Sequence, residues 1–374
     1  MTMQAAEPKE EPTVRTVPEY SKLDLKGNGH TQDSFSLVVE DAVRLLGKDV
    51  AYETIYCLSG NAFAPAIDLG EDCTAWWHVQ GWQADRAMTT VAQSLGFRAE
   101  RLELPPDKLD PTDAGEVFER KALVSRKKCA SIIRNRMEEG AVIITDGGWR
   151  VRTEEGFAPW CWWGIITRAT DGGDIRGTCL RADTGKATGF RDRPLDYLGG
   201  GWAISPGEQA PAADEVDEVV LRQAVARIRG DEPYTATKIS VYGLDAMTSW
   251  IEQMATVPFC ASCADAGSQG MAGCAVNNVQ TLSAGARSAA SYLHRIAPKY
   301  LGEAGSHLET AAKHYDRIVT LLTPATWEFY HNILNDSDKQ KAHAKTALTP
   351  VKAELAAAAD AIERSLVAME GKGA

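Results

Sequence analysis

The densest group of chemically reactive side chains lies in EDCTAWWHVQGW, residues 71–82. Cys73 offers a nucleophilic thiol, and His78 offers a base that can take its proton. Trp76 and Trp77 would wall a pocket for a flat or apolar substrate. A loop held down by burial of its aromatic side chains explains the same residues equally well. Both interpretations of this segment stay open.

Two other side chains are candidate nucleophiles. Ser34 precedes an apolar helical pattern and could attack a substrate if His30 served as its base. Serine is also a common N-cap, and the sequence favours that role for Ser34. Cys57 in IYCLSGNAF precedes a turn and could be a displaced nucleophile, but the sequence favours a buried thiol that fills this turn.

A second tryptophan cluster occurs in APWCWWG, residues 158–164. Together with Trp149 and Trp202, its residues Trp160, Cys161 and Trp162 indicate an aromatic-lined cleft. The alternative is a tryptophan-rich core between a sheet and a helical domain, which the sequence favours somewhat.

Three cysteines near the start of the C-terminal half form the only metal-like spacing. Cys260 and Cys263 make a C-x₂-C pair, and Cys274 follows. Thiolates at that spacing bind zinc well, but a complete site needs a fourth ligand, and the next histidine is His294. A small-residue loop with packed thiols is the favoured interpretation. We therefore expect no cofactor, with zinc or another thiolate-bound metal as the alternative.

The elements that would position these residues divide the chain in two. Residues 1–26 have a composition typical of disorder. Residues 27–205 mix helical and strand patterns, and PGEQAPAAD, residues 206–214, is a linker typical of a domain boundary. Residues 215–374 are helical throughout. The predicted fold class is α+β, with a mixed N-terminal domain and an all-α C-terminal domain.

Apolar spacing of three and four residues predicts the helices, and short β-branched runs bounded by Gly, Asp or Pro predict the strands. The turn at residues 59–61 is expected to separate two short helices. The predicted helices are 34–46, 83–95, 117–138, 216–228, 244–254, 284–300, 307–322, 325–334 and 339–369. The predicted strands are 97–104, 141–145, 162–168, 176–181 and 202–205.

Composition narrows the partners. The 374 residues carry a net charge of −11, and no stripe of Lys and Arg is present, so nucleic acid is not expected. An acidic surface is repelled by anionic lipid, and no apolar stretch is long enough to span a bilayer. The start of the chain has no secretory pattern. We expect a cytoplasmic protein with a small-molecule or peptide partner, and a homodimer remains open.

Several segments together resemble one known family. SFSLVVEDAVRLLGKDVAYETIYCLSGNAF, residues 34–63, is similar to the N-terminal segment of the butirosin-biosynthesis-protein-H-like family. GAVIITDGGW (140–149) and WWGIITRA (162–169) are similar to its two central strands. YGLDAMTSWIEQM (242–254) and ARSAASYLHRI (286–296) are similar to its helical tail. The resemblance implies a papain-like N-terminal domain, similar to that of bacteriocin-processing cysteine peptidases.

The resemblance also implies chemistry: peptide cleavage or acyl transfer by a Cys–His pair oriented by Asp or Asn. It places the nucleophile at the N-terminus of the first helix, where Ser34 stands. The base position holds Cys161 or Trp162, and the orienting position holds Asp183. In this family the loop before the helical tail faces the cleft, which implies ligand contacts for Asn277 and Asn278.

Three hypotheses follow. The chain is a papain-like acyltransferase, amidase or hydrolase that acts on a small amide or thioester through a relocated cysteine, Cys73 or Cys57, with His78. Alternatively, it is a catalytically inactive relative that binds a small molecule or peptide in a tryptophan-lined cleft. The third hypothesis is a metal-binding protein that uses the C-terminal cysteines.

Overall fold

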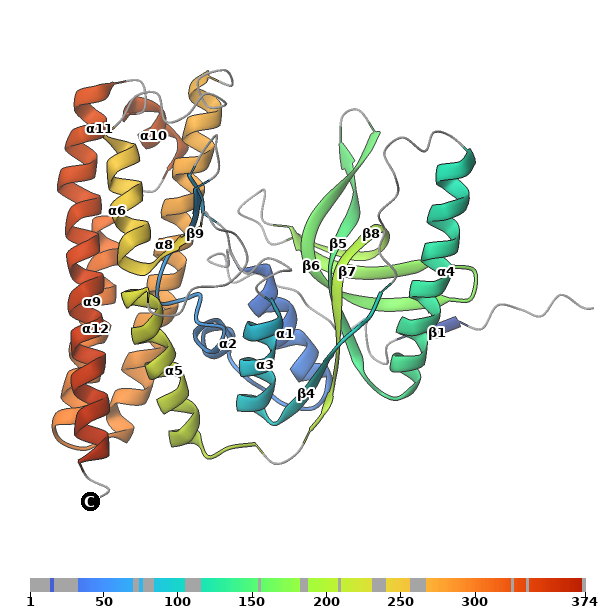
Figure 1. Cartoon of the computed structure of the whole chain (residues 1–374), viewed down its shortest axis with the longest axis horizontal. Coiled ribbons are helices and arrows are strands. Elements are labelled where there is room, and N and C mark those ends of the chain that lie inside the picture. Colours follow the sequence, from blue (N-terminus) through green and yellow to red (C-terminus); the bar gives the residue numbers. More distant parts are fainter. Residues whose placement is uncertain are drawn as a thin grey trace, which may run out of the picture. The chain divides into compact units, whose positions relative to one another are not determined.

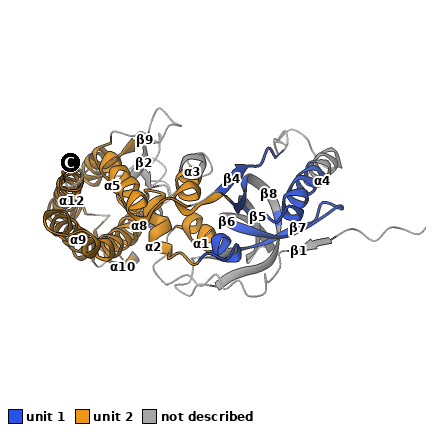
Figure 2. Ribbon diagram, turned by 90° about the horizontal axis from the view of Figure 1, so that it is seen from below, with its two compact units in different colours: residues 1–29, 41–48, 98–206 blue, residues 30–40, 49–97, 207–374 orange. Residues whose placement is uncertain are grey.

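The computed structural model describes residues 14–16, 33–69, 74–76, 84–104, 116–153, 156–181, 188–207, 210–230, 240–255, 267–323, 326–333 and 336–371. Two compact units are present (Figure 2). Unit 1 comprises residues 1–29, 41–48 and 98–206, and unit 2 comprises residues 30–40, 49–97 and 207–374. The protein is therefore of the mixed α+β class.

Unit 1 is built on a six-stranded sheet (Figure 1). Its strands are β1 (Val14–Thr16), β4 (Phe97–Arg101), β5 (Val142–Thr153), β6 (Gly156–Thr170), β7 (Ile175–Arg181) and β8 (Thr188–Pro206). The order is β1-β6-β5-β8-β4, and β7 pairs with both β6 and β8. Because β5 also pairs with both β6 and β8, the strands β5, β6, β7 and β8 form a closed ring of antiparallel pairs.

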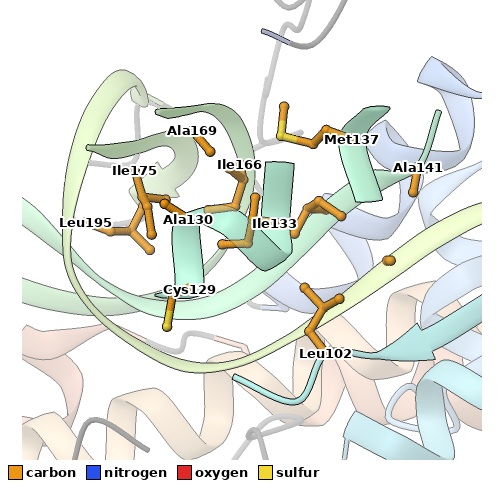
Figure 3. Packing of buried hydrophobic residues seen from close by; sticks show 12 residues of the cluster. Leu102, Cys129, Ala130, Ile133, Met137, Ala141, Ile166, Ala169, Ile175 and Leu195 are labelled. Atoms are coloured by element: carbon orange, nitrogen blue, oxygen red, sulfur yellow. The ribbon is translucent and has the colours of Figure 1, made fainter. Parts of the chain in front are cut away.

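Helix α4 (Glu116–Glu138) covers one face of this sheet. Figure 3 shows Ala130, Ile133 and Met137 of α4 packed toward Ile166 and Ile175 of the strands. Ile143 pairs with Ile166 and with Ala203, and all three belong to this core, so alternation along the strands directs them to the α4 side. Burial of this apolar set stabilises unit 1.

Unit 2 combines N-terminal elements with a helical bundle. Its N-terminal elements are most of α1 (Ser34–Leu45), α2 (Tyr52–Leu58), β2 (Ala66–Leu69), β3 (Thr74–Trp76) and α3 (Ala84–Leu95). Its C-terminal elements are α5 (Ala213–Arg229), β9 (Ser240–Tyr242), α6 (Gly243–Met254), α8 (Gly267–Ile296), η2 (Ala297–Lys299), α9 (Glu303–Leu321), α10 (Trp327–Ile333), α11 (Ser337–His343), the π-helical turn η3 (Ala344–Leu348) and α12 (Thr349–Glu370). Within the bundle, α9 packs on α8 and α12, and α12 packs on α5.

The N-terminal elements join the bundle through specific contacts. Strand β2 is the middle strand of a three-stranded sheet, between β3 and β9. Helix α2 packs on α8, and the Tyr315 hydroxyl of α9 donates to the Phe63 carbonyl at 2.9 Å. Gly285 of α8 lies so close to Ala62 that a Cβ would sit 2.9 Å from the Ala62 carbonyl oxygen. These contacts explain why residues 49–97 belong to unit 2, although the sequence placed all of 27–205 in one domain.

Element positions agree with the sequence better than element lengths do. The boundary after residue 205 is matched by the start of α5 at Ala213, whereas the single helix predicted at 339–369 is divided, and α12 begins at Thr349 with Pro350 in its first turn. The strands β5, β6 and β8 are much longer than the predicted ones. The second short helix expected after Ser59 is instead a turn followed by β2, because this segment pairs with β9. Among the helices of the described ranges, none has an apolar stretch long enough to cross a membrane.

Candidate functional site

The N-terminus of α1 is capped by Asp33. The Asp33 carbonyl accepts the first helical hydrogen bond from Leu37 at 3.3 Å, and its Oδ1 accepts from the Phe35 backbone N–H at 3.2 Å. The Ser36 hydroxyl donates to Asp33 Oδ2 at 2.5 Å. Ser34 is the first helical residue, so the expectation that Ser34 is the N-cap is wrong by one position. A carboxylate accepts these N–H groups more strongly than a hydroxyl does.

Burial raises the pKa of the Asp33 carboxyl to about 6. The Ser36 hydroxyl, the backbone N–H groups of Phe35 and Ser36, and the Asn61 amide all favour the ionised form, but they offset only part of the desolvation cost. The side chain is only 1% exposed. The family resemblance implies a thiolate at this helix N-terminus, but the Asp33 carboxyl already occupies the position.

Two phenols of α2 lie beside Asp33. Burial raises the pKa values of Tyr52 and Tyr56 well above 10, and the nearby Asp33 charge adds to both shifts. The Tyr56 hydroxyl has no hydrogen-bond partner in the part of the chain that the structure describes, whereas the Tyr52 hydroxyl lies by the Asp33 backbone, which offsets a small part of its pKa shift. Both phenols are neutral at physiological pH and cannot act as bases.

Cys57 is not an activated nucleophile. It is fully buried near the end of α2, and its Sγ donates to the Ser288 carbonyl of α8 at 3.7 Å. Burial raises the pKa of the Cys57 thiol well above its ordinary value, and the Arg295 guanidinium offsets only part of that shift. A thiol in this state is neutral and unreactive. The structural alternative, a buried thiol before a tight turn, matches these observations.

The central strands of unit 1 bring tryptophans and glycines together. Trp149 of β5 lies directly opposite Trp160 of β6, and Gly148 and Gly147 lie opposite Cys161 and Trp162. On the other side of β5, Gly148 faces Tyr197 and Gly147 faces Leu198 of β8, with irregular register on both sides of this glycine pair. We call these eight residues the Gly–Trp patch. Glycine inside a strand often marks a bulge or a site where a ligand or backbone approaches closely.

Trp163 and Trp202 belong to the core and not to a binding surface. Their side chains are 3% and 2% exposed, and their rings lie 5.3 Å apart at 40°. The Arg101 guanidinium lies 5.9 Å from the Trp202 ring centroid. The expected cleft lining therefore loses Trp202, and Trp163 of APWCWWG is buried with it.

Several predicted site residues lie outside the described residues. These are Cys73, Trp77, His78, Asp183, Cys260 and Cys263. Trp76 is in β3, paired with Ile67 of β2. Cys274, Asn277 and Asn278 lie within α8 and not in a loop, and Asn278 is 2% exposed. A buried helical position for Asn278 argues against the expected ligand contact.

The described ranges place no cluster of metal ligands at the candidate site, and none of their histidines is on an N-terminal element. They contain no group of three or more His, Cys, Asp or Glu arranged to hold a metal ion. The histidines that they contain are His294, His307, His314, His331 and His343, all on helices α8 to α11. His294 bonds Glu309 and Asp316, His314 bonds Glu354, and His343 bonds the Tyr330 hydroxyl, so three of these rings link helices.

The sequence reasoning missed Asp33, Tyr52 and Tyr56 as a group. Asp33 carried a usable signal, because an Asp directly before an apolar helical pattern is a strong N-cap indicator. The two phenols had none, since only the packing of α2 against the start of α1 places them beside a carboxylate.

Comparison with known proteins identified no relative of this chain. No protein-family model matches the chain, and no curated protein sequence matches it. The class that the structure defines is thus a mixed α+β protein with a ring-closed antiparallel sheet in one unit and a helical bundle in the other.

Proposed function

We propose that this chain is a ligand-binding protein of papain-like descent that does not catalyse thiol-dependent acyl transfer. Its ligand is a flat or apolar small molecule, or a peptide with aromatic side chains, bound at the Gly–Trp patch. The papain-like part of the proposal is supported by the resemblance of residues 34–63 and by a capped helix that precedes an antiparallel sheet.

The strand register carries the binding proposal. Three tryptophan positions, 149, 160 and 162, gather where β5 supplies two consecutive glycines. Indoles contribute large contact areas for apolar ligands, and a glycine leaves its cross-strand position without a side chain. The β5–β8 register is irregular beside both glycines, and such bulges are frequent next to functional sites, which supports a binding site here.

The α1 terminus and Cys57 argue against thiol chemistry. The N–H groups that would stabilise a thiolate or an oxyanion at the start of α1 are already bonded by Asp33. The Cys57 thiol is neutral and buried. The enzyme hypothesis therefore depends on Cys73 and His78 alone.

Binding is tested with the full-length protein and the flat fluorescent probe 8-anilinonaphthalene-1-sulfonate. Trp160→Ala and Gly147→Val are expected to weaken binding about tenfold or more, because one removes an indole and the other adds a branched side chain at the position opposite Trp162, on the same strand face as residues 149 and 160. Gly172→Ala is the control, because Gly172 lies in the turn before β7 and a Cβ there meets nothing closer than 3.6 Å. Circular dichroism verifies that each variant is folded. Equal affinities in all four proteins would remove the patch from consideration.

The non-catalytic part is tested by alkylation of each cysteine as a function of pH, read by peptide mass spectrometry. We expect every thiol to react slowly below about pH 7, as unperturbed thiols with a pKa of about 8.5 do. Rapid reaction of Cys73 at that pH would overturn the proposal in favour of a cysteine enzyme, whatever the dye experiment gives.

A further inference from the structure

A groove of about 460 Å³ opens on unit 2 where three helix ends meet. The first turn of α5 contributes Asp214 and Glu215, the turn before α9 contributes Tyr300 and Leu301, and the last turn of α12 contributes Glu370. Helices α5 and α12 lie side by side in Figure 1. A second groove, of about 410 Å³, is lined by neighbouring residues of α9 and α12. We call the two together the α9–α12 grooves.

Exposed apolar side chains flank the α9–α12 grooves. Leu301 in the first is 78% exposed, and Val367 in the second is 68% exposed. Large apolar side chains at the rim of a groove are typical of interaction sites, whereas single scattered ones need no explanation. The two grooves adjoin on α12, because Leu366 lines the first groove and Val367 lines the second.

Negative charge dominates the lining. Its carboxylates are Asp214, Glu215, Glu218, Glu303, Asp360, Glu363 and Glu370, against Lys299 and Arg364. Lys299 is already bonded to the buried Asp217 at 2.8 Å, so the ammonium group does not offset the rim. Arg222 bridges Glu218 and Glu370, and Arg229 bridges Asp360 and Glu363, which still leaves an acidic excess at Asp214, Glu215 and Glu303.

The end of α12 adds to this potential. A helix C-terminus carries partial negative charge and carbonyls without helical partners, and a basic residue in the last turn usually compensates it. The last turn of this 22-residue helix contains no basic residue, and it ends at Glu370. Arg222 of α5 bonds the Glu370 side chain at this helix end, and the carbonyls of the last turn add to the attraction for a further ammonium or guanidinium group.

We propose that the α9–α12 grooves dock a cationic amphipathic segment of a partner protein. Lysine or arginine side chains of the segment would meet the acidic rim and the end of α12, and an apolar side chain would cover Leu301 and Val367. The argument for this occupant is charge complementarity combined with apolar groups at the same place. The proposal does not depend on the Gly–Trp patch, which lies in unit 1.

The test is fluorescence anisotropy of a labelled synthetic peptide of lysine and leucine at helical spacing, titrated with the full-length protein. Leu301→Asp is expected to weaken binding about tenfold or more through loss of apolar contact. The pair Asp214→Asn and Glu303→Gln is expected to weaken it about threefold or more and to reduce its salt dependence. Leu301, Asp214 and Glu303 are all exposed, so we expect the variants to fold.

Two matched controls are available in the chain. Val219→Ser removes an apolar side chain that is 45% exposed on α5 and does not line either groove. Asp338→Asn removes a first-turn acid of α11, as Asp214→Asn does on α5. Unchanged binding in both controls with loss in the groove variants supports the proposal. Equal loss in the controls, no loss in the groove variants, or self-association of the protein that buries Leu301 would overturn it.

Discussion

Tyr56 and Tyr315 are both fully buried in unit 2, and they differ in what their hydroxyl groups contact. The Tyr315 hydroxyl donates to the Phe63 carbonyl, whereas that of Tyr56 has no hydrogen-bond partner among the described residues. An unpaired buried hydroxyl costs free energy, and a paired one contributes modestly.

The two tyrosines therefore predict opposite results. Tyr315→Phe is expected to lower the free energy of unfolding by about 1 kcal/mol, because it leaves the Phe63 carbonyl without its donor. Tyr56→Phe is expected to leave it unchanged or raise it by up to about 2 kcal/mol. Urea denaturation of the two variants is the measurement, and a similar loss in both would show that the Tyr56 hydroxyl is bonded after all.

Asp33 predicts a pH dependence of stability. Its pKa is raised from 3.8 to about 6 on folding, so its contribution is fully present below pH 3.8 and is lost as pH rises through 6. Asp33→Asn removes this loss. The free energy of unfolding of the variant, relative to the parent, should rise by up to about 3 kcal/mol between about pH 4 and pH 7, measured by urea denaturation.

Asp336 is the matched control for that experiment. It caps α11 in the same way, with its side chain accepting from the backbone N–H groups of Asp338 and Lys339. Chiefly because of the Lys339 N–H, its pKa is lowered and not raised, so its contribution is present at neutral pH and is lost as pH falls. The relative stability of Asp336→Asn should change in the opposite direction, and parallel profiles for the two variants would contradict the assignment for Asp33.

At the scale of elements, two glycines at helix ends differ in why a glycine is required: one needs only a positive φ, and the other also lacks room for a Cβ. Gly230 ends α5 at φ +78°, and a Cβ there would lie 3.6 Å from its nearest neighbour, the Tyr242 carbonyl oxygen. Gly243 begins α6 at φ +57°, where a Cβ would lie 2.2 Å from the Ile228 carbonyl oxygen. Only the second position combines a left-handed backbone with a clash against another segment.

The two alanine substitutions should therefore differ in cost. Gly230→Ala is expected to lower the free energy of unfolding by about 1 kcal/mol, the cost of a left-handed conformation. Gly243→Ala is expected to cost about 3 kcal/mol or more, because the end of α5 must also move away. Thermal or urea unfolding of both variants measures the difference. Equal losses would mean that the end of α5 can move away from residue 243 at little cost in free energy.

Helix positions were predictable from the sequence because local signals mark their ends. Asp33 precedes α1, Gly96 follows α3, Gly140 follows α4 and Pro350 stands at the start of α12. Strand lengths were not predictable, because residues 146–153, 156–161 and 188–201 extend β5, β6 and β8 only through pairing with other strands. The break in the last predicted helix, at the π-helical turn η3, has no marker that the sequence reasoning recognised.

At the scale of the whole molecule, the chain crosses between the units more than once. The division after residue 206 lies near the expected linker, but residues 49–97 pack with helices that follow it by more than a hundred positions. We therefore expect that the C-terminal helices do not form a self-sufficient domain, since β9 pairs with β2 and α8 packs on α2.

Fragments test this organisation. Residues 207–374 alone are expected to lack a cooperative urea transition and near-ultraviolet circular dichroism, because α8 and α9 would expose the apolar surface that α2 and Phe63 cover. Co-expression with residues 1–206 should restore both signals. A cooperative transition of 207–374 by itself would show that the helical segment folds independently, as the sequence alone indicated.

The sequence by itself determined the mixed α+β class, the helices of the C-terminal half and the linker near residue 206, because periodicity, caps and composition are local properties. Only the tertiary structure decided that Asp33 lies beside two buried phenols, that Cys57 is a neutral buried thiol and that two glycines of β5 lie among tryptophans. Each of these depends on residues distant in the chain, whose approach sets burial, pKa and strand register. Local sequence patterns do not encode that approach.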